Sequence, residues 1–137
     1  MPLEAGIGME RSFVIGRENT AAAVAERDDP EGPMLPEVWS TPDMIGKMEV
    51  VCAALAAAGL ATGQMTVGSR IEASHLGATA IGSRVQVQAT LTAVDGRKLS
   101  FAVAVFDEVE KVGEATHVRY IVDVEKFDSR LRAKCTR

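Results

Sequence analysis

Residues 41–60, TPDMIGKMEVVCAALAAAGL, are the stretch that decides the fold. Thr41 precedes a proline at the first helical position and then an acid, and this order predicts that Thr41 caps the start of a helix. The pattern continues to about Ala58, where Gly59 is expected to end the helix. Because the second half of this helix is apolar all round, we expect it to be buried on most sides.

Four stretches after this helix alternate apolar and polar residues with a period of two. This period predicts strands over residues 65–75, 85–93, 99–105 and 112–122. Asp95-Gly96 predicts a hairpin turn between the second and third strands, and residues 107–110 predict the next turn. We therefore expect consecutive strands to pair antiparallel. A further short strand is predicted over residues 11–18.

The chain of 137 residues, with 47% hydrophobic and 25% charged residues, has the composition of one compact domain, residues 1–137. One long apolar helix followed by strands with one apolar face each predicts an α+β fold. In this fold an antiparallel sheet curls around one long central helix. In so short a chain, part of the helix or of a sheet edge is expected to need a second subunit.

Composition and charge also limit the location and the partners. The longest apolar run, residues 50–60, is about half as long as a membrane-crossing helix, and the acidic start lacks the apolar core of a signal peptide. Cys52 and Cys135 form no CxxC pair, which favours a reducing compartment. A net charge of -4 argues against a general nucleic-acid surface. We expect a soluble cytoplasmic protein that binds neither membranes nor nucleic acids.

Two segments do not fit the regular pattern. Residues 28–41, DDPEGPMLPEVWST, hold three of the five prolines and the only tryptophan, and loops of this length are usually lids, binding loops or disordered. We call them the lid loop. Residues 126–137, the basic tail, are most often a solvated terminus, although their charge also suits phosphates. The basic residues of the tail are Lys126, Arg130, Arg132, Lys134 and Arg137, opposed only by Asp128.

Glu49 is the only charged residue on an otherwise apolar face of the predicted helix. At 100° per residue, its neighbours within about 60° are Pro42, Ile45, Gly46, Cys52, Ala53, Ala56 and Leu60. Asp43 and Lys47 form an i,i+4 pair on what we expect to be the wet face. A lone buried carboxylate usually has a partner or a task. The alternative is a carboxylate satisfied by the backbone or reaching solvent at the helix edge.

His75 lies at the end of the first predicted strand. The period places it on one face with Met65, Val67, Ile71 and Ala73, which we expect to face the helix. An inward imidazole beside the small-residue loop LGATAIG suits a general base. For His75 in isolation, a histidine bonded to a loop carbonyl is the commoner outcome. The sequence assigns no direction to His117, because neither face of its strand is cleanly apolar.

Thr41 is adequately explained as a helix cap, but a helix N-terminus also offers free N–H groups to a developing oxyanion. The sequence contains no G-x-S-x-G, P-loop or dinucleotide-binding glycine pattern, and no metal-ligand spacing. We therefore expect neither a metal nor a cofactor.

Three features together resemble the fluoroacetyl-CoA thioesterase-like group of hotdog-fold acyl-CoA thioesterases. They are LPEVWSTPDMIGKMEVVCAAL at residues 35–55, His75 twenty-six residues after Glu49, and VDGRKLSFAVAVFDEVEKVGEATHVRYIVDVEKF at residues 94–127. The resemblance covers roughly residues 10–133. It implies a hotdog fold that forms a homodimer, or a higher oligomer of dimers, with active sites between subunits that accept the pantetheine arm of coenzyme A.

In this group a Thr, a Glu and a His form the active site, and the matching positions here are Thr41, Glu49 and His75. The resemblance implies hydrolysis of acyl-CoA thioesters, with Glu49 acting either as nucleophile or as general base on water. His75 then exchanges protons with water or the leaving thiolate. Thr41 and nearby helix amides hold the thioester carbonyl.

Substrate contacts are predicted at Leu35, Gly46 and Arg119, the last of which matches an arginine after the family's T-H-x pattern. The fluoroacetyl-specific members carry phenylalanine where this chain has Leu35. We therefore expect a small or medium acyl-CoA substrate without a strong fluoroacetyl preference. Two alternatives are a non-catalytic acyl-CoA binding or sensing module and a hotdog enoyl-CoA hydratase, although such hydratases usually show an Asp/His pair with different spacing.

Overall fold

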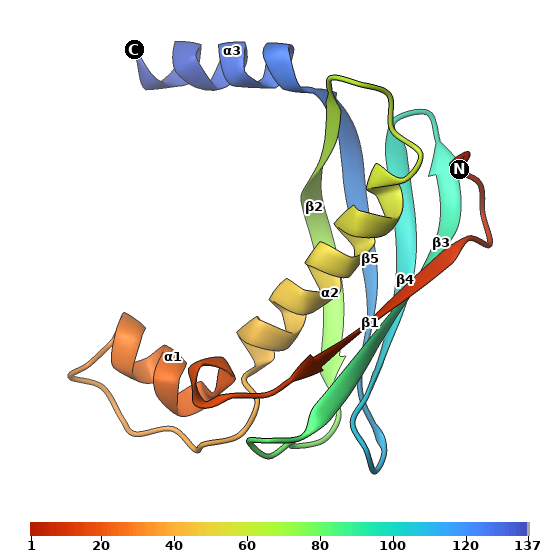
Figure 1. Cartoon of the computed structure of the whole chain (residues 1–137). Helices are drawn as coiled ribbons and strands as arrows, with labels where there is room; N and C mark the ends of the chain where they lie inside the picture. The colour runs from red at the N-terminus through yellow and green to blue at the C-terminus, as the bar shows by residue number, and fades with distance from the viewer. Residues whose placement is uncertain (137) are drawn as a thin grey trace.

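The computed structural model describes residues 1–136 and shows a five-stranded antiparallel sheet wrapped around one long helix (Figure 1). The strands are β1 (Gly8–Val14), β2 (Gln64–His75), β3 (Arg84–Asp95), β4 (Lys98–Phe106) and β5 (Lys111–Asp123). The helices are α1 (Ala21–Asp28), α2 (Thr41–Ala57) and α3 (Val124–Cys135), with a 3-10 turn, η1, at Arg17–Asn19. The predicted α+β fold and its central helix are confirmed.

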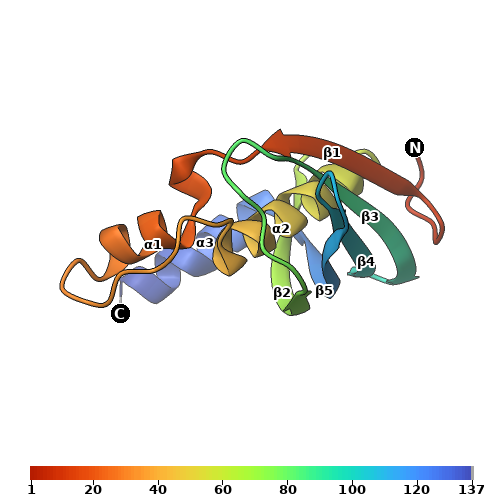
Figure 2. The same cartoon turned by 90° about the horizontal axis from the view of Figure 1, so that it is seen from below.

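The core lies between α2 and the concave side of the sheet. Seen from below, the strands form an arc around α2 (Figure 2). The helix contributes Met44, Met48, Val51, Cys52, Leu55 and Ala56. Alternate residues of the middle strands face it, among them Val85, Val87, Leu91, Leu99, Phe101 and Val105. Each large apolar side chain buried here stabilises the fold by about 1.5–3 kcal/mol, before entropy is subtracted.

The second half of α2 is buried on most sides, as predicted, but within one chain the helix keeps an exposed strip. Gly46, Val50 and Ala57 are exposed, and 58% of the surface of Val50 is open to solvent. The sheet curls around one side of the helix only, which leaves an apolar strip of α2 uncovered. This strip supports the expectation that a second subunit completes the helix environment.

The Asp43–Lys47 pair forms as predicted, with 2.7 Å between Oδ2 and Nζ, but it does not lie on a wet face. Asp43 also accepts hydrogen bonds from Trp39 Nε1 at 2.7 Å and Asn19 Nδ2 at 3.1 Å. Burial alone would raise the pKa of Asp43, but bonds from Lys47, Trp39 and Asn19 outweigh it and hold the pKa below its usual value. The pair therefore ties the end of the lid loop to the start of α2.

The strand order is β1-β3-β4-β5-β2. The predicted consecutive pairs β3–β4 and β4–β5 are confirmed, and Gly96 in the hairpin adopts a φ of 60°. The predicted β2–β3 pair is wrong, because β2 pairs with β5 and β1 pairs with β3. Residues 76–83 are too long for a tight hairpin and instead cross the end of the sheet. There the Leu76 amide bonds the Val112 carbonyl and the Ile15 amide bonds the Ser83 carbonyl.

The first strand lies earlier in the chain than predicted. Its ladder with β3 runs from Gly8 opposite Thr90 to Val14 opposite Arg84. Beyond it the chain turns into η1, where the Gly16 amide donates to the Asn19 side chain at 2.9 Å. This local hydrogen bond offers the backbone an alternative to the sheet, so the strand ends before the predicted limit of residue 18.

A bulge at Ser69 changes which residues of β2 face α2. Gly68 pairs with Arg119 whereas Arg70 pairs with Val118, so one extra residue is inserted into β2. Such an insertion moves every side chain before it to the other face. Ile71, Ala73 and His75 face the helix as predicted, but Met65 and Val67 face away, and Thr66 and Gly68 replace them.

The lid loop contains no helix or strand between the end of α1 and the start of α2, as its prolines predict. Residues 126–135 of the basic tail lie in α3, in which no residue is buried. Arg137, the last basic residue of the predicted tail, lies outside the described residues. In residues 1–136, no helix has the length and apolar character that a bilayer crossing requires.

Candidate active site

Thr41 and His75 meet at the N-terminal end of α2. The Thr41 Oγ1 lies 2.8 Å from the His75 Nδ1. Thr41 is not the helix cap, contrary to prediction, because Ser40 caps the helix by accepting a hydrogen bond from the Asp43 amide at 3.1 Å. Thr41 is therefore the first helical residue and Pro42 the second. Since Ser40 takes the capping role, the Thr41 hydroxyl is free to bond the imidazole.

The first turn of α2 offers fewer amides than predicted. Pro42 has no N–H. The Asp43 amide bonds the Ser40 side chain, and the Met44 amide bonds the Ser40 carbonyl at 3.1 Å. Within the described chain, the Thr41 amide is the remaining N–H of this turn that a ligand oxyanion can use.

His75 has the properties of a base at neutral pH. It is half-buried, and its ring meets the ring of Trp39 edge-on, with 6.1 Å between centroids. Burial lowers the pKa of His75, so the imidazole is neutral at pH 7. The buried Nε2 has no hydrogen-bond partner in residues 1–136. One ring nitrogen thus bonds Thr41 and the other remains available for proton transfer.

A cavity of about 350 Å³ opens at this pair. Its walls come from the end of the lid loop, the start of α2 and the segment after β2. The lining residues are Ala21, Val38, Trp39, Ser40, Thr41, His75, Leu76, Gly77 and Ala78. Trp39 was not among the predicted site residues, although it is the only tryptophan and lies two residues before Thr41. Leu35 and Gly46, both predicted substrate contacts, are exposed and do not line this cavity.

His75→Ala should lower the hydrolysis rate, and wild-type kcat/KM should rise with pH as the imidazole loses its proton. Because the pKa of His75 is lowered, the midpoint of this rise should lie below about 6.5, the ordinary value for histidine. Initial rates measured from pH 5 to 9 test this. A flat profile together with near wild-type activity of His75→Ala would rule out a proton-transfer role.

A second polar cluster lies deeper, between α2 and the sheet. The buried Arg119 donates from Nε to Thr66 Oγ1 at 2.8 Å and from Nη1 to His117 Nε2 at 3.2 Å. A guanidinium only donates, so His117 carries its proton on Nδ1 and donates it to the Arg70 carbonyl at 2.7 Å. Burial and the charge of Arg119 lower the pKa of His117. His117, to which the sequence assigned no direction, therefore faces the core and holds Arg119.

Glu49 approaches this cluster from α2. A Cβ placed on Gly68 would lie 3.2 Å from Arg119 Nη1 and 3.6 Å from Glu49 Oε1, so both charged groups surround this glycine. Cys52, one helical turn after Glu49, has its pKa raised to about 12 by burial, which excludes a thiolate nucleophile at this position. Among the groups near Arg119, Glu49 is therefore the carboxylate available for chemistry.

Thr41 and Glu49 do not meet within one chain. The helix begins at Thr41, and eight rises of 1.5 Å separate the two residues by roughly 12 Å along the axis. The structure thus brings Thr41 together with His75, and Glu49 together with Arg119. The three predicted catalytic residues form two separate groups in a single subunit.

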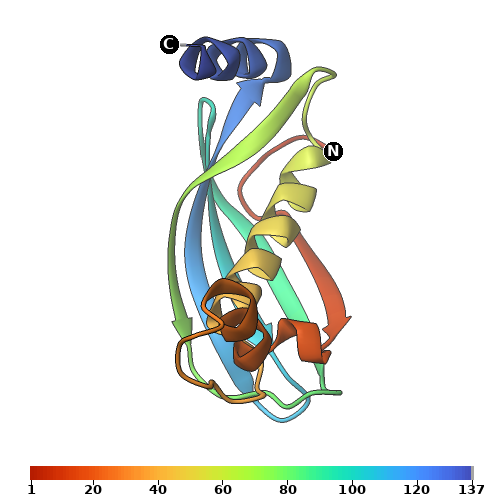
Figure 3. The ribbon, with the colours of Figure 1, turned by 90° about the vertical axis from the view of Figure 1, so that its left-hand side faces the viewer.

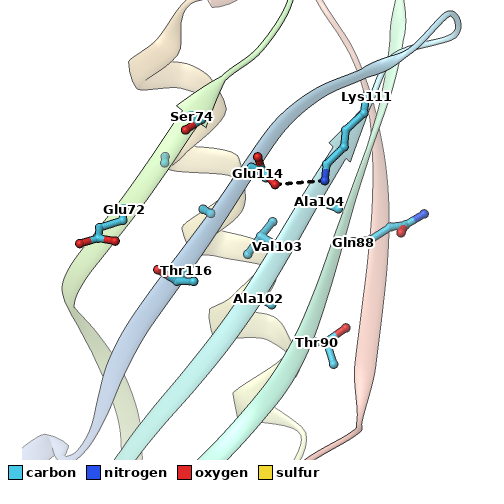
Figure 4. A pocket seen from close by; sticks show the side chains of 12 residues that line it. Glu72, Ser74, Gln88, Thr90, Ala102, Val103, Ala104, Lys111, Glu114 and Thr116 are labelled. Carbon is cyan, nitrogen blue, oxygen red and sulfur yellow. Dashed lines mark hydrogen bonds and ion pairs between the residues drawn. The ribbon is translucent and has the colours of Figure 1, made fainter.

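A hollow of about 550 Å³ lies on the outer face of the sheet and carries no matching chemistry (Figure 4). Ala102, Ala104 and Thr116 form its floor, and Lys111 pairs with Glu114 at 3.2 Å. No histidine or cysteine lines it. The smaller cavity at Thr41 is therefore the better candidate active site, because it joins an imidazole, a hydroxyl and a helix end.

Comparisons with known proteins agree with this fold. The family model of fluoroacetyl-CoA-specific thioesterases matches residues 17–125. The fluoroacetyl-CoA thioesterase of Streptantibioticus cattleyicolor is 38% identical over 107 residues, which cover 78% of this chain and 77% of that protein. A Thermus thermophilus member of the thioesterase superfamily has a TM-score of 0.88 at 24% identity, covering 98% of this chain and 95% of that one, and supports the fold alone.

Solved structures extend the match over nearly the whole chain. A phenylalanine-to-alanine variant of the fluoroacetyl-CoA-specific thioesterase gives a TM-score of 0.90 at 34% identity, with 98% of both chains covered. The same variant in complex with fluoroacetate and CoA gives 0.83 at 34% identity, covering 91% of this chain and 99% of that one. The resemblance inferred from the sequence is confirmed, as are the hotdog fold and the thioester hydrolase activity. The chain belongs to the fluoroacetyl-CoA-specific thioesterase family and is an acyl-CoA thioesterase.

Proposed function

We propose that this thioesterase hydrolyses small or medium acyl-CoA substrates at a site shared by two subunits. Thr41 and His75 come from one subunit, and Glu49 comes from the other. The observation that carries the proposal is the 2.8 Å contact between Thr41 and His75 at the end of a helix on which Glu49 lies roughly 12 Å away. Two side chains so far apart on one helix cannot both reach one thioester carbon.

A two-fold dimer with α2 helices side by side and antiparallel resolves this separation. If Thr41 lies beside the partner subunit's Glu49, the two helices cross midway between these positions, near Ile45 and Gly46. The exposed strip of α2 contains Gly46, where an added Cβ would meet no atom within 4 Å. A glycine at the crossing point allows two backbones to approach closely. Among the strands of residues 1–136, β2 lies at the edge of the sheet, and its outer side is available to the same interface.

Hydrolysis replaces the C–S bond of the thioester by a C–O bond and transfers a proton to the leaving thiolate. Glu49 attacks the carbonyl or deprotonates the attacking water, and both roles require an ionised carboxylate. If Glu49 deprotonates the attacking water, the proton is left on Glu49, and His75 relays it to the thiolate as the C–S bond breaks. If Glu49 attacks directly, an acyl–Glu49 anhydride forms as the thiolate leaves; the neutral His75 then accepts a proton from the water that hydrolyses the anhydride and passes it to the thiolate. The Thr41 hydroxyl and amide hold the carbonyl oxygen as negative charge develops on it.

Release of free CoA thiol from a panel of acyl-CoAs tests the proposal. Straight-chain acyl groups from two to ten carbons should define an optimum, with the Thr41→Ala variant as the matched control of low activity. Binding without thiol release would indicate a non-catalytic module. Addition of water to an enoyl-CoA with the thioester left intact would indicate a hydratase.

We also assign this activity to the cytoplasm. Both cysteines are free, with Cys52 buried in the core and Cys135 exposed on α3. An exposed free thiol persists in a reducing compartment and is readily oxidised elsewhere. Labelling of Cys135 by a thiol reagent in freshly lysed cells, without prior reduction, tests this assignment.

The fluoroacetyl preference should be weak or absent. The lid loop carries the aliphatic Leu35 and Met34 where an aromatic ring would be needed to close over a two-carbon acyl group, and they are 43% and 93% exposed. The ratio of kcat/KM for fluoroacetyl-CoA over acetyl-CoA should stay below about 1000, or about 4 kcal/mol. Leu35→Phe is the matched variant and should raise this ratio. A wild-type ratio above that limit would show that Leu35 does not determine specificity.

A further inference from the structure

Helix α3 leaves the C-terminal part of its apolar side uncovered in the single chain: Val124 and Phe127 are half-buried, whereas Leu131 and Cys135 are exposed. At 100° per residue, an arc of about 80° holds Val124, Phe127, Leu131 and Cys135. No residue of α3 is buried, and Leu131 is 50% exposed. An isolated helix of this length is marginal in water. The uncovered stripe therefore points to a surface that α3 contacts outside its own chain.

The charge of α3 is complementary to that of the lid loop. Within residues 126–135, the basic residues are Lys126, Arg130, Arg132 and Lys134, opposed by Asp128. The lid loop carries no basic residue, and its acidic residues are Asp28, Asp29, Glu31 and Glu37. The two segments thus attract each other at neutral pH.

Part of the lid-loop charge is not paired within the subunit. Arg27 bonds Asp28, and Arg17 bonds Glu37. Asp29 and Glu31 have no ion pair in the part of the chain that the structure describes. The neighbouring Met34 and Leu35 expose apolar surface, so the lid loop offers both free carboxylates and an apolar contact. These are the two features that complement the basic flanks and apolar stripe of α3.

The two segments cannot meet within one chain, because they lie at opposite ends of the sheet. In Figure 1, α3 is at the top and α1 with the lid loop at the bottom, and both reach out past β2 on the same side. Figure 3, seen from that side, shows α3 and α1 both in front of the sheet. A two-fold axis near the middle of α2 exchanges the two ends. The α3 of one subunit then lies level with the lid loop of the other.

We propose that α3 of each subunit docks on the lid loop of its partner and holds that loop beside the active site. The proposal rests on the dimer described under the proposed function. Leu131 packs against the partner subunit's Met34 and Leu35, while Arg130 and Arg132 face the partner subunit's Asp29 and Glu31. Since the lid loop leads directly into Thr41, this contact makes the C-terminal helix part of the active-site architecture.

Charge reversal tests the contact. The double variant R130E/R132E should raise the dimer dissociation constant by about 10-fold, measured by sedimentation at low ionic strength. At enzyme concentrations well above that constant the variant is still dimeric. Its KM should rise and its kcat should stay unchanged, because the lid loop is released but the reacting groups are intact. Adding D29K/E31K to the same chain reverses both partners and should restore dimer stability and KM.

The variant R11E/K111E changes the net charge by the same amount on β1 and β5 and should behave like the wild type.

A second test uses the exposed Cys135: with Met34→Cys, mild oxidation should give a disulfide-linked dimer that Cys135→Ser abolishes. If the wild-type chain is an active dimer, but R130E/R132E leaves the dimer dissociation constant unchanged and oxidation of the Met34→Cys variant gives no disulfide-linked dimer, the α3 contact alone is overturned. So would binding of α3 to phosphatidylserine vesicles with unchanged dimer stability. A wild-type chain that releases no thiol from acyl-CoA would instead contradict the proposed function.

Discussion

Glu49→Gln should lower thioester hydrolysis by at least about 100-fold while the chain still folds. The substitution keeps the shape of the side chain but removes its charge and its basicity, and both roles open to Glu49 need the carboxylate. Within residues 1–136 no hydrogen bond or ion pair to the Glu49 side chain is present, so the fold loses no specific contact. Steady-state kcat/KM and a thermal unfolding curve for the same preparation measure the two effects separately.

The matched control is Glu72→Gln on β2, an exposed carboxylate that, among the described residues, forms an ion pair only with the neighbouring Arg70. This variant should retain wild-type activity. If Glu49→Gln unfolds, the residue supports the structure rather than the reaction. If it folds and keeps most of its activity, Glu49 is neither nucleophile nor base, and the proposed mechanism fails.

Mixing inactive Thr41→Ala and Glu49→Gln chains should restore activity. In a heterodimer one site receives both intact residues and the other site receives neither. Random exchange at equal concentration makes half of the dimers mixed, so recovery should reach about one quarter of the wild-type activity. Thiol release, followed after subunit exchange has been verified by mass spectrometry, measures the recovery.

The structure supplies a matched control for this mixing experiment. Thr41 and His75 contact each other within one subunit, so mixing Thr41→Ala with His75→Ala leaves every site with one defect. That mixture should stay inactive. Absence of recovery in the Thr41 and Glu49 mixture would refute the shared site and leave the thioesterase activity of the family untouched.

Elements whose signals are local were predicted well. The helix from Thr41 and the strands β3, β4 and β5 follow from hydrophobic period and turn chemistry, and the Asp95-Gly96 hairpin forms as expected. The position of β1 was displaced, because its strand pattern is weak and its limits are set by pairing with β3. The alternation of β2 also predicts the wrong face for the residues before Ser69, because a bulge reverses the faces of a strand without changing its composition.

In the candidate site, too, the features with a local sequence signal are predicted and those that depend on the backbone geometry or on distant segments are not. Thr41, Glu49 and His75 were selected from a helix start, a lone charge on an apolar face and a strand end. The capping of α2 by Ser40 was missed, because Ser40 and Thr41 both suit that position and only the backbone geometry distinguishes them. The sequence assigns no role to His117, because that role depends on a hydrogen bond to Arg70, forty-seven residues away in the chain.

The sequence by itself determined the α+β class, the central helix and the family resemblance, because these depend on residues close together in the chain or on spacings along it. Only the tertiary structure decided that β2 lies beside β5, that Thr41 bonds His75, and that Arg119 is held by His117 near Glu49. These arrangements depend on packing between distant segments. A pattern along one strand or helix states which face is apolar, but not which other segment covers it.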